Sequence, residues 1–216
     1  MLVERKMKRS PITIGPEESL KYAMELVKEK KVRHLPVLDE GKLVGILSDR
    51  DIRQAWASSA TTLEIRELYY LLDRLKVKEI MTKKVITVTP DTTIEEAALL
   101  LHDHKIGCLP VLSKGEFMGI ITETDIFEVF VEVMGLGQES SRIEVVLEDR
   151  PGTLAGVVAI VKALGVNIVS LVTYPLHEQG KGVAVLRAAI RDPSGLVSEI
   201  AKAGYQVLSA MPAGSS

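Results

Sequence analysis

The 216-residue sequence has a single cysteine, Cys108, and almost no excess charge, because 27 basic and 29 acidic side chains leave a formal net charge of −2. One cysteine excludes an internal disulfide and a cysteine-rich zinc site. The apolar neighbours of Cys108 indicate a small buried side chain. Balanced charge argues against a nucleic-acid partner. With 46% hydrophobic and 26% charged residues, the composition is that of a globular protein.

The sequence also lacks long apolar runs and the short motifs of common catalysts. No stretch reaches the ~18 apolar residues that cross a bilayer, and the charged start at 1–9 does not resemble a secretory signal. We therefore expect a cytoplasmic protein with no membrane partner. No nucleophile elbow, P-loop or zinc-ligand spacing is found, and His102 and His104 do not share a helix face. We expect no catalytic residues, no metal and no enzyme activity.

What the sequence does contain is an internal repeat. Residues 45–52 (GILSDRDI) and 119–126 (GIITETDI) share one pattern at a spacing of 74 positions. The same spacing maps Met7 onto Met81, so the match extends beyond this phrase. Agreement at one fixed spacing predicts two structurally equivalent units. Units of about 60 residues are marginally stable alone, so we expect them to pack against each other.

Each unit is expected to contain three strands and two helices in the order β-α-β-β-α. In the first unit the strands are expected at 11–14, 33–38 and 43–47, and the helices begin near Ser19 and Ser48. In the second unit the strands are expected at 85–88, 108–112 and 117–121, and the helices begin near Thr93 and Asp125. The predicted domain limits are 1–58 and 77–134, with a helical linker at 59–76 that contains an amphipathic helix over 63–75.

The end of each repeated phrase allows two interpretations. Ser48 and Thr122 each precede an aspartate, Asp51 or Asp125, by three positions at a predicted helix start. A hydroxyl and an acid at this spacing form a capping box, which needs no ligand. A helix N-terminus also attracts phosphate, and the aspartate can accept hydrogen bonds from both hydroxyls of a ribose. The spacing alone favours neither interpretation.

Each unit as a whole resembles a cystathionine-β-synthase (CBS) domain, and the pair resembles a Bateman module. This resemblance implies that the two domains pack head to tail and form two clefts for adenine nucleotides such as AMP, ADP or ATP. Asp51 and Asp125 match the ribose-binding position, and Ser48 and Thr122 match the phosphate-side position. The other positions that match nucleotide-binding residues of the family are Thr13, Ile14, Arg33, His34, Leu35, Thr87, Val88, Cys108 and Leu109.

The two predicted clefts differ in one cation. Arg33 occupies a position where some CBS domains hold a phosphate, whereas the second unit has Ile106-Gly107 in the corresponding place. The second cleft lacks this positive charge, so we expect the two clefts to bind nucleotide unequally.

The last third of the chain follows a different pattern. A polar linker at 135–141 precedes elements expected in the order β-α-β-β-α-β over 142–212. This order is the ferredoxin-like split motif, which many unrelated functions share. The expected fold class is therefore α+β in all parts of the chain.

Two short phrases in this last part, DRPG at 149–152 and GVNI at 165–168, resemble the ACT domain. The resemblance implies edge-to-edge pairing of two copies and a small amino acid bound between them. A glycine at a helix start lets a ligand carboxylate approach the backbone. The alternative is that both phrases are turns without a ligand. The residues matched to such a site are Asp149, Pro151, Gly152, Asn167 and Ile168.

A CBS pair followed by an ACT domain resembles the acetoin-utilisation regulatory proteins of bacteria. The resemblance implies a homodimeric sensor without chemistry of its own, in which bound ligand shifts an arrangement that an unidentified protein target reads. Two alternatives stay open: a ligand-free structural dimerisation module and a nucleotide-metabolising enzyme.

Overall fold

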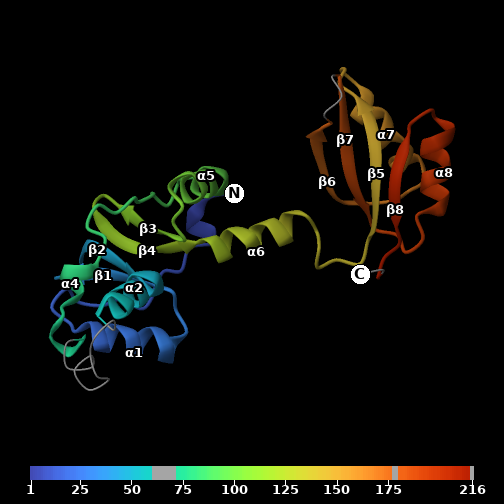
Figure 1. Ribbon diagram of the computed structural model, residues 1–216. Helices are drawn as coiled ribbons and strands as arrows, with labels where there is room; N and C mark the ends of the chain where they lie inside the picture. The colour runs from blue at the N-terminus through green and yellow to red at the C-terminus, as the bar shows by residue number, and fades with distance from the viewer. Residues whose placement is uncertain (60–71, 177–179, 215–216) are drawn as a thin grey trace. The chain divides into compact units, whose positions relative to one another are not determined.

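The computed structural model describes residues 1–59, 72–176 and 180–214 (Figure 1). Most of the amphipathic helix expected over 63–75 lies outside the described residues, as does His177. The chain divides into two compact units, Met1–Phe127 and Glu128–Ser216. Each unit is described by itself below.

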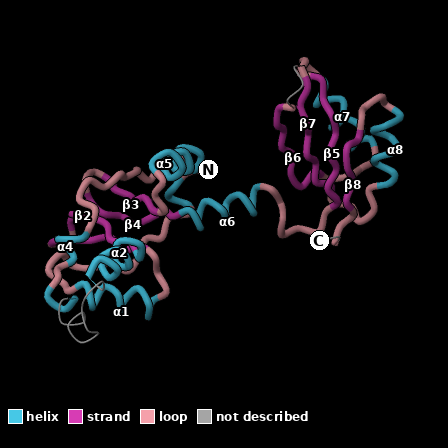
Figure 2. The backbone as a smooth tube through the Cα atoms, viewed as in Figure 1, coloured by secondary structure: helices cyan, strands magenta, loops and turns pink. Residues whose placement is uncertain are grey.

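The first unit contains both repeats. The elements of the first are η1 (Val3–Arg5), α1 (Leu20–Lys30), β1 (His34–Asp39), β2 (Lys42–Ser48) and α2 (Asp49–Ser59). Those of the second are α4 (Val77–Ile80), α5 (Ile94–His104), β3 (Cys108–Ser113), β4 (Glu116–Thr122) and the start of α6 (Glu123–Val133). Each repeat contributes one antiparallel hairpin, and β2 lies against β4 (Figure 2).

The first strand expected in each repeat is shorter than the sequence pattern indicates. Only Ile14 and Val88 form a bridge, each running parallel to the middle of the hairpin strand of its own repeat. The Ile14 amide donates to Pro36 O at 3.1 Å and its carbonyl accepts from Leu38 N at 2.9 Å. Proline follows two residues later in both repeats. Because proline has no amide hydrogen, the pairing does not continue.

Local sequence explains where the helices and hairpins begin and turn. Ser19 caps α1 by accepting a hydrogen bond from the Tyr22 amide, and Thr93 caps α5 in a full capping box with Glu96. The hairpin turns place two successive residues at positive φ, which is typical of type I′ turns. These residues are Glu40-Gly41 in the first repeat and Lys114-Gly115 in the second.

The two repeats exchange their leading segments. The Val3 amide of the first repeat donates to Thr92 O of the second at 2.9 Å, and the Val77 amide of the second donates to Glu18 O of the first at 3.0 Å. Both valines are fully buried. The start of each repeat is thus part of the other repeat's structure, which joins the two repeats more tightly than contact between their sheets alone.

A glycine in each repeat permits this exchange. A Cβ atom on Gly119 would overlap the backbone carbonyl of Lys8, and one on Gly45 would overlap the side chain of Met81. The repeated phrase therefore begins with glycine because the leading segment of the other repeat passes directly over it.

The core of the first repeat lies between its hairpin and its helices. Leu20 and Ala23 of α1 pack with Leu35 and Leu47 of the hairpin, and all four are fully buried. The apolar positions of α1 recur at helical spacing, so one helix face covers one face of the hairpin. The N-terminus of α2 is left at the end of β2, where the polar residues of the phrase lie.

The second unit is a four-stranded antiparallel sheet with two helices. Its elements are β5 (Ser141–Glu148), α7 (Thr153–Ala163), β6 (Ile168–Pro175), β7 (Lys181–Ala188), α8 (Ser194–Lys202) and β8 (Val207–Met211), and the strand order is β6-β7-β5-β8. Both helices cover one face, where Ile143, Leu186, Val157 and Ile200 form a buried core (Figure 1). The β-α-β-β-α-β order expected from the sequence is confirmed.

Candidate functional site: a cleft between the repeats

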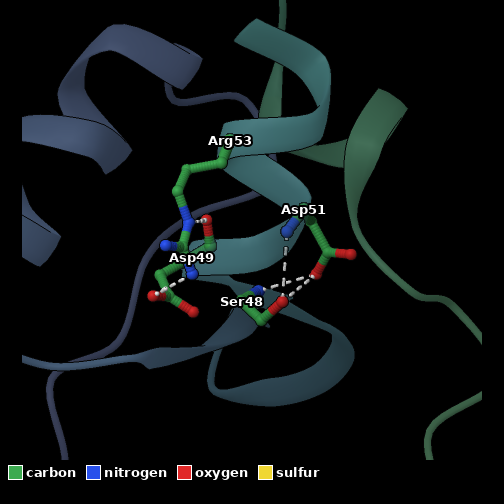
Figure 3. A network of polar contacts seen from close by, with 4 residues as sticks. All are labelled: Ser48, Asp49, Asp51 and Arg53. Atoms are coloured by element: carbon green, nitrogen blue, oxygen red, sulfur yellow. Dashed lines mark hydrogen bonds and ion pairs between the residues drawn. The ribbon is translucent and has the colours of Figure 1, made fainter. Parts of the chain in front are cut away.

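The hydroxyl and the acid of each repeated phrase form a capping box (Figure 3). Asp51 Oδ2 accepts from the Ser48 amide at 2.8 Å and from the Ser48 hydroxyl at 2.6 Å, and the Asp51 amide donates back to Ser48 Oγ at 3.2 Å. Thr122 and Asp125 repeat this geometry at 2.7, 2.6 and 3.4 Å. These bonds use only one oxygen of each carboxylate. The capping role therefore leaves room for a second role at Oδ1.

A cavity of about 520 Å³ opens beside Asp51 and is lined by both repeats. This volume is within the range of small-molecule sites. From the first repeat the polar lining includes Arg33, His34, Ser48, Asp49, Asp51 and Arg53. From the second repeat the lining includes Thr82, Lys84, Lys105, Gly107, Cys108 and Glu123. The exchange of leading segments brings Thr82 to this place, because its amide and carbonyl both pair with Ile46 of β2.

Basic side chains from both repeats border the cavity. Arg33, Lys84 and Lys105 lie on its rim and are exposed to solvent. Arg53 is held by an ion pair of 2.9 Å with Asp49, which Figure 3 shows within the first turns of α2. The N-terminus of α2 adds its own partial positive charge. The cavity lining therefore contains three acids, Asp49, Asp51 and Glu123, and several cations, of which Arg53 already pairs with Asp49. Such a mixture suits a ligand that carries both hydroxyls and phosphates.

His34 forms one wall of this cavity. The imidazole ring packs directly against Gly107 of the second repeat. A Cβ atom on Gly107 would lie 3.0 Å from two ring atoms of His34. Burial lowers the pKa of His34, although the nearby carboxylates of Asp49 and Glu123 oppose this shift. The neutral imidazole is therefore favoured and can accept or donate one hydrogen bond at the cavity wall.

Cys108 lies on the floor of the cavity but is not reactive. It is buried, and desolvation raises the pKa of its thiol to about 12. A thiol that is protonated at neutral pH is a poor nucleophile. The expectation of a small buried side chain agrees with this environment.

The equivalent aspartate in the second repeat is buried and paired. Asp125 is only 3% exposed, and its Oδ1 forms an ion pair with Lys8 Nζ at 3.6 Å. Lys8 corresponds to Thr82 at the repeat spacing of 74, and its amide and carbonyl pair with Ile120 as those of Thr82 pair with Ile46. The two repeats thus have matching backbone hydrogen bonds at this place, with Lys8 paired to Asp125 in one and Thr82 lining the cavity of Asp51 in the other.

The structure separates the predicted nucleotide-binding residues into two groups. Five of them line the open cavity: Arg33, His34, Ser48, Asp51 and Cys108. The others lie outside it: Thr13, Ile14, Leu35, Thr87, Val88, Leu109, Thr122 and Asp125. Leu35 and Leu109 are fully buried in the core, and Ile14 and Val88 are almost so.

Sequence reasoning missed the contribution of the leading segments. Thr82 and Lys84 line the open cavity, and Lys8 pairs with Asp125. The signal was present, because the spacing that maps Met7 onto Met81 also maps Lys8 onto Thr82. Which repeat receives each segment is visible only in the hydrogen bonds between repeats.

The predicted amino-acid site is divided in a single copy of the second unit. Pro151 and Gly152 line one cavity, of about 630 Å³, at the start of α7. Asn167 and Ile168 line another, of about 380 Å³, at the start of β6. Asp149 lines a third cavity beside β7. In one copy, Asn167 and Ile168 therefore line a different cavity from Pro151 and Gly152.

Metal and membrane sites are not apparent in the described part of the chain. Among residues 1–59, 72–176 and 180–214, no group of three or more His, Cys, Asp or Glu side chains is placed to hold a metal ion. Within the same residues, no helix is both long and apolar enough to cross a bilayer.

Two repeats that together line a cavity, followed by a ferredoxin-like unit, define a regulatory, ligand-binding module. Comparison with known families agrees: the CBS domain matches residues 3–58 and 77–132, and the ACT domain matches residues 141–204. The chain belongs to the CBS-domain family, with an ACT domain after its CBS pair.

Known relatives include both an enzyme and CBS-domain proteins without a stated activity. Inosine-5'-monophosphate dehydrogenase of Korarchaeum cryptofilum is 39% identical over 120 residues, which are 55% of this chain but only 22% of that enzyme. A CBS domain-containing protein of Dictyostelium discoideum is 32% identical over 136 residues, which are 62% of this chain and 94% of that protein. The likeness to the enzyme therefore covers only a small part of that enzyme.

Solved structures show the same CBS pair. A protein described as an acetoin utilization protein (AcuB) from Vibrio cholerae has a TM-score of 0.54 at 33% identity, covering 63% of this chain and 95% of that one. The CBS domain pair of protein MJ0100, in complex with 5'-methylthioadenosine and S-adenosyl-L-methionine, has a TM-score of 0.51 at 30% identity, covering 60% of this chain and 95% of that one.

Proposed function

We propose that this protein is a sensor that binds an adenine nucleotide in the cleft beside Asp51. The observation that carries this proposal is the pairing of an aspartate with cations in one cavity. Figure 3 shows one carboxylate oxygen of Asp51 turned away from the cap. That oxygen is suited to accept hydrogen bonds from ribose hydroxyls. The related CBS pair with bound adenosine derivatives supports an adenosine ligand.

The phosphates are proposed to lie toward the basic rim. Arg33 offers a planar guanidinium that can bind two phosphate oxygens at once, and Lys84 and Lys105 add point charges. The start of α2 supplies amide hydrogens to the same region. A rim with several cations favours ADP or ATP over AMP, because each further phosphate finds a further positive charge.

The proposed role is regulation, with no reaction at the site. The cavity lining includes the buried thiol of Cys108, whose raised pKa keeps it protonated at neutral pH. Bound nucleotide would act by favouring one of two arrangements that an unidentified protein partner, in acetoin utilisation or another pathway, distinguishes. A ligand-free dimerisation module is the alternative.

Calorimetric titration of the full chain with AMP, ADP and ATP tests the proposal. The wild type is expected to bind, and Asp51→Ala is expected to weaken binding about 10- to 100-fold, because hydrogen bonds to a charged group contribute ~1.5–3 kcal/mol. Asp125→Ala is the matched control and should bind like the wild type. Absence of heat with all three nucleotides at millimolar concentration would contradict the proposal, as would unchanged binding by Asp51→Ala.

A second candidate function is amino-acid binding by the ACT domain. Gly152, at φ 90°, precedes α7 and provides no side-chain cap for its first amides. Those amides are oriented to receive a carboxylate. Because Asn167 and Ile168 line a separate cavity, the proposed site forms between two copies of the chain. Thermal-shift measurements with the twenty amino acids, combined with sedimentation analysis, test both points. A monomer without any shift would contradict this candidate.

A further inference from the structure

Each duplicated aspartate lies near a residue from the leading segment of the other repeat: Lys8 pairs with Asp125, and Thr82 lines the same cavity as Asp51. Lys8 and Thr82 hold equivalent places at the repeat spacing. The Lys8 amide donates to Ile120 O at 2.8 Å and its carbonyl accepts from Ile120 N at 3.0 Å, and the matching bonds of Thr82 with Ile46 are 2.9 and 3.0 Å. The backbone therefore delivers either residue to the same spot. The two positions therefore differ only in the side chain, lysine in one and threonine in the other.

At Asp125 both carboxylate oxygens are engaged. Oδ2 belongs to the cap with Thr122, and Oδ1 faces the Lys8 ammonium at 3.6 Å. The Asp125 side chain is 4% exposed, whereas the Lys8 side chain is 59% exposed. Lys8 therefore covers an acid that is itself almost buried. A ribose could reach Oδ1 only by displacing this ammonium and leaving a buried carboxylate without its counter-charge, which is unfavourable.

The counterpart of Arg33 does not distinguish the two sites. Gly107, which corresponds to Arg33 at the repeat spacing, lines the open cavity together with it, and the His34 ring lies against Gly107. What distinguishes the second aspartate is its ion pair with Lys8.

We propose that Lys8 is a tethered cation that occupies the sugar position of the second cleft, so that each chain binds one nucleotide instead of two. This inference rests on the proposed nucleotide binding at Asp51 and concerns a different cleft. The substitution Lys8→Thr gives the second repeat the residue that the first has at this place. Its backbone bonds to Ile120 do not involve the side chain, and threonine suits an extended segment.

The test is equilibrium dialysis of the full chain with radiolabelled ATP, which reports the number of ATP molecules per chain at saturation. We expect one for the wild type, one for the charge-preserving control Lys8→Arg, and two for Lys8→Thr. One ATP bound by Lys8→Thr, or two by the wild type, would overturn the proposal. Weaker binding by Lys8→Thr without a new site would show instead that Lys8 holds a phosphate, which also overturns it.

The double variant Asp51→Ala/Lys8→Thr separates this inference from the proposed function. With the first cleft disabled, the expected single ATP must occupy the second cleft. If the wild type binds no ATP, the function proposed for Asp51 fails, whereas the double variant still decides the role of Lys8: one ATP supports it and none overturns it. Thermal melting of each variant by circular dichroism confirms that it is folded.

Discussion

The two duplicated aspartates of the first unit form equivalent helix caps but have different surroundings. Asp51 and Asp125 cap equivalent helices with nearly identical hydrogen bonds. One faces a cavity of about 520 Å³ beside Thr82, and the other is buried under Lys8. The difference teaches that a duplicated motif can keep its structural role in both copies while residues outside the motif determine which copy is open to a ligand.

The largest expected effect concerns the glycines over which the leading segments pass. Gly119→Ala should lower the free energy of unfolding by about 3 kcal/mol, because the new methyl group overlaps the Lys8 carbonyl, which belongs to the backbone. Gly45→Ala should cost about 1 kcal/mol, since its main obstacle is the flexible side chain of Met81. Urea unfolding of both variants measures these free energies. Equal losses would show that the two leading segments pass equally close to the glycines of the other repeat.

The next effect concerns the aspartates themselves. Asp125→Ala should cost about 2 kcal/mol of stability, because it removes a cap and leaves Lys8 without its buried partner. Asp51→Ala should cost about 1 kcal/mol, the usual value for a cap. The order for nucleotide binding should be the reverse, with Asp51→Ala the more harmful. Denaturant midpoints measure the loss of stability and calorimetry measures the loss of binding. The same order of the two variants in both experiments would contradict the different roles assigned to Asp51 and Asp125.

A lysine placed in the open cleft should close it. Thr82→Lys reproduces the arrangement at Asp125 and should weaken ATP binding at least about tenfold, equivalent to about 1.4 kcal/mol. The control Thr82→Ser keeps a small hydroxyl and should bind like the wild type. Calorimetry provides the measurement. A lysine variant that binds more tightly would mean that this position contacts phosphate and not the aspartate.

The smallest expected effect is a pH dependence of stability due to His34. Burial lowers the pKa of His34 in the folded protein, so the unfolded chain binds the proton more readily. This contribution to stability is complete above the ordinary histidine pKa of about 6.5 and is lost as the pH falls below it. The carboxylates of Asp49, Glu123 and Asp51 oppose this lowering of the His34 pKa, whereas the Arg33 guanidinium adds to it.

Urea midpoints at about pH 7.5 and 5.5 measure the contribution of His34, over a range where carboxylates of ordinary pKa stay ionised. The wild type should lose a small part of its stability at the lower pH. His34→Gln, which cannot take up a proton, should lose less. An identical pH dependence in the two proteins would assign the effect to other groups.

Much of the fold could be predicted from local sequence. Ser19 and Thr93 mark helix starts, Gly41 and Gly115 mark hairpin turns, and the order of elements in the last third of the chain is confirmed. The strands expected at 11–14 and 85–88 are reduced to single bridging residues, because alternation of side chains does not reveal where a neighbouring proline ends the pairing. Domain limits and ligand contacts stay predictions.

The sequence predicts that the two clefts bind nucleotide unequally, because Arg33 has no basic counterpart at Gly107. Unequal binding stays a prediction, and the structure places both residues in the lining of the open cavity, so this difference does not distinguish the clefts. The opposing pair Lys8 and Thr82 is visible in the same alignment, but its meaning depends on which aspartate each residue meets. Lys8 lies 117 positions from Asp125 in the sequence, and no local pattern links them.

Residue type and spacing alone were sufficient for the repeat, the caps, the turns and the α+β class, because these depend on interactions among residues a few positions apart. The choice of the open cleft required the folded chain. There, hydrogen bonds between the repeats bring Lys8 to Asp125 and Thr82 to the cavity beside Asp51, so that one of two equivalent aspartates forms an ion pair with a lysine far away in the sequence.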